Sequence, residues 1–342
     1  MSRGAKSSAP KVSLGLPVYN GENFLAEALD CLLAQTFTDF ELIISDNAST
    51  DFTQSICEEY AEKDRRIKYF RQPENRGAGA NYDFTFYKAQ APYFRWCTHD
   101  DLMGDDFLEA CVAHLDAHPE AVGALPKDVR EIDETGQFLK AIHITFGSNS
   151  ANGAERFAAY TPLSRSEQFH CMPFFSLFRR EALARTNLHG DYLSSDRILI
   201  AEMLLHGEIA LLSTSSVSFR RHEAQYSTVS MRQDVEFAIE WFQPKNAGKR
   251  VFKKARYLRE LMRSLSRARP TLHDRRVALA GVAQLAWSER RDLVKEMLIP
   301  FFRNGRRTAL GTIVFRPTHA ASDIAHRLRQ RTKLKGSTGS RQ

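Results

Sequence analysis

The sequence predicts an α/β fold with a doubly wound, mostly parallel sheet flanked by helices, followed by a basic helical extension. From Lys11 to about residue 120, short apolar runs alternate with segments of helical periodicity, and polar clusters follow three of these runs. Such alternation is typical of βαβ units. Ligands bind beyond the carboxyl ends of the strands in such sheets, so we expect the polar clusters to form the site.

The apolar pattern predicts the elements of this first half in order. We expect strands at 12–18, 40–45, 67–70 and 93–98. Helices are expected at 22–35, 50–62, 80–89 and 105–118. The first helix, for example, repeats Leu25, Leu29 and Leu32 at helical spacing after the turn signal at Gly21.

Beyond residue 120 the pattern becomes less regular. A hairpin is expected at 129–145, where Asp133 begins a turn that ends in Gly136. A polar loop is expected at 146–165, strands at 171–178 and 209–219, and a helix at 195–206. After Met231 the chain is helical in character, with prolines as the breaks.

The composition is that of an ordinary globular protein. The chain has 342 residues, of which 43% are hydrophobic and 26% charged. Its five cysteines form no C-x-x-C pair, which favours a reducing cytoplasm over a disulfide framework. The polar N-terminus has no secretory h-region, and no run of about 18 apolar residues predicts a membrane-spanning helix.

The net charge of +7 is unevenly distributed. Residues 245–342 contain 25 Lys and Arg against 6 Asp and Glu, a charge of +19, so residues 1–244 carry −12. A basic segment of this kind favours an anionic partner such as a membrane surface or a phosphate-bearing lipid. The alternatives are a helical subdomain packed on the first domain and an oligomer contact.

The segment Thr98-His99-Asp100-Asp101 closes the fourth predicted strand. Adjacent carboxylates at a strand end are hard oxygen ligands for Mg²⁺ or Mn²⁺, and such an ion neutralises a departing diphosphate. The alternative is that both aspartates cap the following helix, because Asp is a preferred N-cap residue.

Two further clusters follow the second and third predicted strands. Asp46-Asn47-Ala48-Ser49-Thr50-Asp51 has a carboxylate suited to a base N–H, and Asn75-Arg76-Gly77 is a turn with an Arg suited to phosphate. Helix capping and a flexible turn are the alternatives.

These motifs, in this order, resemble the signature of family 2 glycosyltransferases of the GT-A fold. The resemblance covers about residues 11–225 and rests on four segments: Leu16-Pro17-Val18-Tyr19-Asn20-Gly21, Asp46-Asn47-Ala48-Ser49-Thr50-Asp51, Glu74-Asn75-Arg76-Gly77 and His99-Asp100-Asp101. It implies a Rossmann-like GT-A domain at 11–230, with a nucleotide-sugar half at 11–120 and an acceptor half at 121–230. A basic helical extension at 231–335 would follow, with disordered ends at 1–10 and 336–342.

For the donor, the resemblance implies that Pro17 and Tyr19 line the nucleobase pocket. Asp46 would accept a hydrogen bond from the base, with Asn47 beside it. Arg76 would lie near the base or diphosphate. Asn47 stands where many members of the family have a second acid, so its contact is left open.

For the chemistry, the resemblance implies that Asp100 holds the ribose or sugar and that Asp101 ligates the metal. Asp196, at the head of a predicted helix, lies where the family places its catalytic base, with helix capping as the alternative. His222 follows a strand and is a second candidate metal ligand or a surface histidine. Asp191 and Glu202 are fallback bases.

The resulting prediction is a metal-dependent, inverting glycosyltransferase. It would use Mn²⁺ or Mg²⁺ and a UDP-, dTDP- or GDP-sugar, and transfer to a glycan or lipid-linked acceptor in bacterial surface polysaccharide synthesis. We expect it in the cytoplasm, peripheral at the inner face of the membrane, with no nucleic acid partner and its oligomeric state left open. The alternatives are a sugar nucleotidyltransferase and a non-enzymatic anion-binding protein.

Overall fold

The computed structural model describes residues 9–163, 169–223, 225, 241–242, 244 and 252–303. For residues 169–171, 297 and 299–303 it describes the backbone alone. The expected disordered ends at 1–10 and 336–342 lie almost wholly outside this range.

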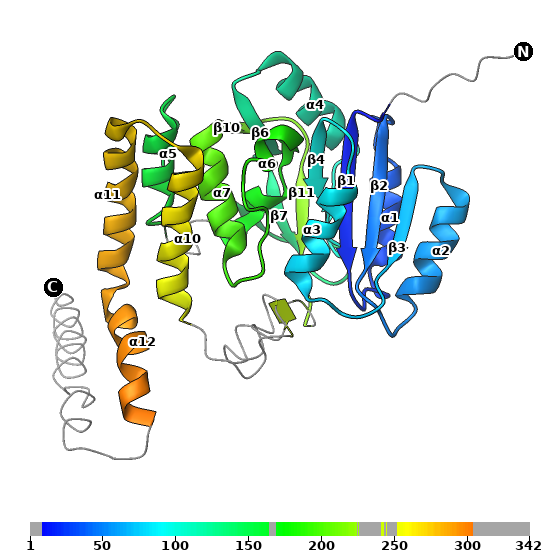
Figure 1. Ribbon diagram of the computed structural model, residues 1–342. Coiled ribbons are helices and arrows are strands. Elements are labelled where there is room, and N and C mark those ends of the chain that lie inside the picture. Colours follow the sequence, from blue (N-terminus) through cyan, green and yellow to red (C-terminus); the bar gives the residue numbers. More distant parts are fainter. Residues whose placement is uncertain are drawn as a thin grey trace, which may run out of the picture. The chain divides into compact units, whose positions relative to one another are not determined.

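The first part of the chain alternates strands and helices, as predicted (Figure 1). The strands are β1 (Val12–Val18), β2 (Phe40–Asp46), β3 (Ile67–Arg71), β4 (Tyr93–Trp96) and the two-residue β5 (Leu102–Met103). The helices are α1 (Leu25–Leu33), α2 (Thr53–Lys63), α3 (Ala78–Lys88) and α4 (Phe107–Ala117).

The main sheet has seven strands in the order β10-β6-β9-β4-β1-β2-β3. It includes β6 (Ala121–Pro126), β9 (Leu177–Arg179) and β10 (Glu208–Leu212). β1 runs parallel to β2 and β4, β2 to β3, and β6 to β10, whereas β9 is antiparallel to both of its neighbours. The sheet is therefore mixed and mostly parallel.

Helices cover both faces of this sheet. Because side chains alternate along a strand, Leu42 and Ile44 of β2 pack in a core with α1, α2 and α4. Ile43 packs on the opposite face, in a core that contains α3 and α7 (Ser195–His206). Burial on both faces explains why β1 and β2 are apolar over most of their length.

A second sheet has the order β5-β11-β7-β8. β7 (Val129–Ile132) and β8 (Phe138–Ile142) form the predicted hairpin, and β11 (Val217–Arg220) pairs with both β7 and β5. The pairing with β5 brings residues 217–220 beside the segment that follows Asp101. This second sheet thereby adds a wall to the site.

The predicted loop at 146–165 was wrong, because it contains the helix α5 (Gly153–Tyr160). Asn152 caps this helix by accepting hydrogen bonds from the amides of Ala154 and Glu155. The helix has only 8 residues, which is too short for its periodicity to stand out in the sequence.

Two predicted strands also differ. The strand at 171–178 was wrong over most of its length, because a 3-10 helix, η1 (Phe169–Phe175), occupies it and contains Pro173. Proline has no N–H for a sheet ladder. The strand at 209–219 is in fact β10 and β11, which belong to different sheets.

The described part of the predicted helical extension includes α10 (Lys253–Ala268) and α11 (Leu272–Ser288), separated at Pro270. Leu261 and Leu265 of α10 lie in the same apolar core as α7, and α11 packs on α5 (Figure 1). A Cβ at Gly281 would lie 2.5 Å from the carbonyl oxygen of Ala158, so α11 needs glycine at this crossing.

One compact unit ends at Arg290, and a second begins at Arg291 within α12 (Arg290–Arg303). The proposed domain boundary at residues 230–231 lies outside the described residues. Among the helices that are described, none has the length and apolar character that crossing a bilayer requires.

A buried ion pair joins α10 to α7. Glu202 is 1% exposed and accepts hydrogen bonds from Arg267 at 2.7 and 2.6 Å and from Ser264 at 2.9 Å. The side chain of Glu202, a fallback base in the sequence-based prediction, is therefore engaged in a structural contact.

We predict that Arg267→Ala destabilises the fold by about 3–5 kcal/mol, because it leaves the buried carboxylate of Glu202 without its cation. Urea unfolding measures this loss. Lys63→Ala is the control, because Lys63 and Glu59 are 65% and 61% exposed in their pair, so we expect a loss of about 0–1 kcal/mol. Equal losses for the two variants would contradict the prediction.

Candidate active site

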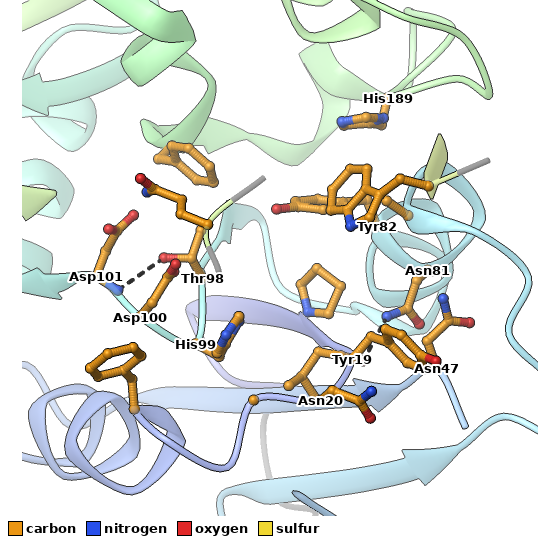
Figure 2. A pocket seen from close by; sticks show the side chains of 18 of the residues that line it. Tyr19, Asn20, Asn47, Asn81, Tyr82, Thr98, His99, Asp100, Asp101 and His189 are labelled. Atoms are coloured by element: carbon orange, nitrogen blue, oxygen red, sulfur yellow. Dashed lines mark hydrogen bonds between the residues drawn. The ribbon is translucent and has the colours of Figure 1, made fainter. Parts of the chain in front are cut away.

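A cavity of about 300 Å³ opens at the carboxyl ends of β1, β2 and β4. Figure 2 shows Tyr19, Asn20 and Asn47 along one part of it and Asp100 and Asp101 at another. Residues distant in the chain complete the lining: Tyr82, Phe174, Phe175, His189, Asp196, Phe219, His222, Gln225, Trp241 and Phe242. The strand-end clusters therefore meet at one edge of the sheet, as the parallel topology requires.

The turns after β1 and β2 are joined by hydrogen bonds. The amide of Asn20 donates to Ser49 Oγ at 2.9 Å, and Asn20 Oδ1 accepts from the amide of Thr50 at 2.9 Å. Asn20 is left-handed (φ 51°), a conformation that Asn tolerates well. These bonds hold Pro17 and Tyr19 at the cavity, with Tyr19 41% exposed.

Asp46 is fully buried and does not line the cavity. Its carboxylate accepts hydrogen bonds from the amide of Ser49 at 2.8 Å and from the hydroxyl of Tyr69 at 2.9 Å. Burial and this bond to Asp46 raise the pKa of Tyr69. In this structure Asp46 stabilises the turn that follows β2. Its contact with a nucleobase stays a prediction.

Asn47 lines the cavity and holds the turn after β3. Its Nδ2 donates to Asn75 Oδ1 at 2.8 Å, and its Oδ1 accepts from the amide of Arg76 at 2.9 Å. A carboxylate at position 47 would lack the donor, which gives a physical reason for the amide here. Arg76 itself is exposed and does not line the cavity.

Asp100 and Asp101 are held by the segment that follows β11. His222 Nε2 lies 3.0 Å from Asp100 Oδ2, and the amide of Arg220 donates to Asp101 Oδ1 at 3.0 Å. Burial opposes ionisation of Asp100, but His99 and His222 hold its pKa below the ordinary value. Burial and the Asp100 charge raise the pKa of Asp101.

Arg220 holds this arrangement together through its hydrogen bonds. The sequence-based prediction missed its role. It is 1% exposed, and its guanidinium donates to the carbonyl oxygens of Asp100 and Glu134 and to the carboxylate of Glu27. The guanidinium also lies over the ring of Phe24, 4.9 Å from the ring centroid. Within Arg220-Arg221-His222-Glu223, nothing in the sequence distinguished the buried arginine from its neighbour.

Asp196 and an aromatic wall also line the cavity. Asp196 lies in the first turn of α7, half-buried, and its Oδ1 accepts from the amide of Arg197 at 2.8 Å. Beside it are the rings of Tyr82, Phe174 and His189. The sequence-based reasoning missed these aromatic residues, whose only signal was the aromatic content of the segments around them.

The charges at this cavity are mostly negative. No Lys or Arg occurs among the described residues that line it, whereas three aspartates do. Across the described ranges no cluster of three or more His, Cys, Asp or Glu is arranged to hold a metal ion. The metal-binding roles of Asp101 and His222 therefore stay predictions, as do the roles of the other site residues.

Residues 13–186 match the family model described as Glycosyl transferase family 2. An uncharacterized glycosyltransferase of Rickettsia typhi is 40% identical over 101 residues, 30% of each chain. The putative glycosyltransferase EpsE of Bacillus subtilis is 36% identical over 113 residues, which cover 33% of this chain and 41% of EpsE. The chain thus matches well under two thirds of these relatives.

Among solved structures, S. aureus TarS 1-349 in complex with UDP-GlcNAc is similar with a TM-score of 0.50 and 18% identity. The match covers 82% of this chain and 83% of that one. At this identity the likeness concerns the fold alone.

We predict that Asp83→Asn flattens the pH dependence of stability. Burial raises the pKa of Asp83 from 3.8 to about 7, although it accepts a hydrogen bond from the amide of His189. Between about pH 4 and pH 7 the unfolded chain releases a proton that the fold retains, so wild type loses stability as the pH rises. Above about pH 7 the loss of stability caused by ionised Asp83 has reached its full value.

The asparagine keeps an acceptor for His189 and has no charge to bury. Urea unfolding of both proteins across this pH range measures the difference in free energy of unfolding. The advantage of the variant should grow from about pH 4 to pH 7 and then remain constant. A difference that does not change with pH would contradict the assignment.

Proposed function

The chain belongs to glycosyltransferase family 2, and from this premise we propose a metal-dependent, inverting transfer from a nucleotide sugar to a glycan or lipid-linked acceptor. The observation that supports this proposal is that one cavity is lined by residues from both halves of the domain: Tyr19, Asn47, Asp100, Asp101 and Asp196. A donor bound at the strand ends would therefore share the cavity with the carboxylate of Asp196.

The proposed chemistry uses Asp196 as the general base. Its carboxylate takes the proton of the acceptor hydroxyl while that oxygen attacks C1 of the sugar. The bond from C1 to the nucleoside diphosphate breaks, and its electron pair leaves with the diphosphate. Because attack comes from the face opposite the leaving group, the configuration at C1 inverts.

The residues at the other side fit a divalent cation. A buried carboxylate, Asp100, and a half-buried one, Asp101, with no Lys or Arg among the described lining residues, suit a hard cation that takes its remaining ligands from the diphosphate and water. Asp101 would hold Mn²⁺ or Mg²⁺, with His222 as the second candidate ligand, and the ion would neutralise charge on the departing diphosphate.

The test is a thermal-shift screen of UDP-, dTDP- and GDP-sugars with and without Mn²⁺. UDP-sugars come first because TarS 1-349 was crystallised with UDP-GlcNAc. We expect one donor class to raise the melting temperature of wild type and of Asp196→Asn, but not of Asp101→Ala. Asp196→Asn should lower the transfer rate by about 10²–10⁴-fold.

The control for these variants is Asp105→Asn, at an exposed aspartate just after β5 that does not line the cavity. It should retain both the thermal shift and the transfer. If no nucleotide sugar shifts the melting temperature of wild type, the proposed donor dependence is wrong. A thermal shift that survives in Asp101→Ala would reject only the metal-ligand role of Asp101.

We also propose that the basic C-terminal part contacts an anionic membrane peripherally. α11 ends near Trp287, which is 70% exposed and has Arg290 4.4 Å above its ring. Residues 304–342 lie outside the described range and contain nine Lys and Arg against one Asp. Basic segments with exposed Trp suit the interface of an anionic leaflet.

Vesicle flotation tests this contact. A chain that ends at Arg303 keeps α10 and α11, which pack on the catalytic unit, and removes only the basic tail. We expect full-length protein to float with anionic vesicles and the shortened chain to float less, with neither floating with neutral vesicles. Equal recovery of the two chains with anionic vesicles would reject a role for the tail.

A further inference from the structure

The cavity has an aromatic wall near Asp196. It is built from α3, η1 and the segment before α7, which contribute Tyr82, Phe174 and His189. Figure 2 shows Tyr82 and His189 on a side of the cavity away from Asn47 and Asp100. On the proposed function, with the nucleotide at the strand ends, this wall faces the acceptor.

The rings of this wall are ordered by stacking. His189 lies between Tyr82, at 4.7 Å and 21°, and Phe242, at 5.4 Å and 18°. Phe174 meets the His189 ring edge-on at 5.1 Å and stacks on Trp96 at 4.6 Å. This stacking leaves little of Phe174 and His189 exposed, whereas Tyr82 stays partly open to the cavity. A preordered aromatic surface of this kind binds a flat apolar face at little entropic cost.

Hydrogen bonds set the orientation of His189. Its backbone amide donates to Asp83 at 3.0 Å, and its Nδ1 lies 3.1 Å from the carbonyl oxygen of Gly190 and 3.2 Å from Ser195 Oγ. Because a carbonyl oxygen only accepts, the proton belongs on Nδ1. Nε2 then keeps its lone pair and has no partner among the described residues.

The charge of the wall restricts what it binds. The ring of His189 is buried, which lowers its pKa and keeps it neutral. The ionisable side chains facing the cavity are the carboxylates of Asp100, Asp101 and Asp196 and the imidazoles of His99, His189 and His222, with no Lys or Arg described there. An anionic acceptor group would meet negative charge without a compensating cation.

We propose that this wall is an acceptor subsite for a neutral sugar ring, in which the C–H face of a pyranose packs on Tyr82, the least buried of the three rings, and His189 Nε2 accepts a hydrogen bond from a ring hydroxyl. A pyranose has both features: an apolar face for the aromatic rings and hydroxyl donors at its edge. A polyol phosphate has neither the flat face nor the neutral charge. The acceptor hydroxyl that reacts is then presented to Asp196.

The probes are methyl pyranosides of glucose, galactose, mannose and N-acetylglucosamine, compared with glycerol 3-phosphate and ribitol 5-phosphate. Binding to the full chain is followed by quenching of tryptophan fluorescence, since Trp241 lines the cavity and Trp96 stacks on Phe174. We expect at least one pyranoside to bind more tightly than either phosphate. Tighter binding of a phosphate, or no binding by any pyranoside, would overturn the proposal.

His189→Phe keeps an aromatic ring but removes the lone pair, so we expect pyranoside affinity to fall by about 3- to 10-fold. His189→Gln keeps an acceptor and should restore part of this loss. His206→Phe is the control, because His206 is a half-buried histidine at the end of α7 that does not line the cavity. Unchanged pyranoside affinity in His189→Phe would overturn the role of His189.

The donor-induced thermal shift of each variant is measured in parallel. His189→Phe should keep this shift, because His189 lies on the acceptor side of the cavity. A protein that binds pyranosides but shows no donor shift in wild type would count against the proposed function and leave the sugar subsite standing. A donor-induced thermal shift in wild type with no pyranoside binding would support the proposed function and overturn the sugar subsite.

Discussion

The buried guanidinium of Arg220 is the constraint on which the candidate site depends. It joins three parts of the molecule: the loop after β4, through the carbonyl of Asp100; the β7–β8 hairpin, through Glu134; and α1, through Glu27. A buried arginine is stable only if its donors are satisfied. The same segment binds both aspartates, through the amide of Arg220 and the ring of His222. The second sheet thereby sets the position of the acidic pair.

The cavity has two chemically different sides. The side at the strand ends is polar, with amides and carboxylates held by bonds between neighbouring turns. The side near Asp196 is aromatic and held by stacking. On the proposed function, the absence of Lys and Arg among the described lining residues would leave the diphosphate to a cation and would favour a neutral acceptor. One charge pattern therefore constrains both substrates.

The helical extension has two physical roles that composition alone did not separate. α10 and α11 are basic, yet they pack through an apolar core and the Glu202–Arg267 pair, so they belong to the compact unit that contains α7 and Asp196. Their arginines do not therefore mark a membrane surface by themselves. The membrane proposal rests on the residues beyond this unit and on the exposed Trp287.

The βαβ half and the meeting of its polar clusters follow from the sequence alone, because strands buried on both faces must be apolar and parallel strands end at one edge. The sequence did not predict α5, η1 or the division of β10 from β11, because these short elements lack a clear period.

The identity of the side chains that complete the cavity depends on tertiary contacts. Arg220 lies 120 residues from its Asp100 partner and His189 lies 106 from Asp83. No local pattern encodes such contacts, and burial, which distinguishes Arg220 from Arg221 and removes Asp46 from the cavity wall, exists only once the chain is folded.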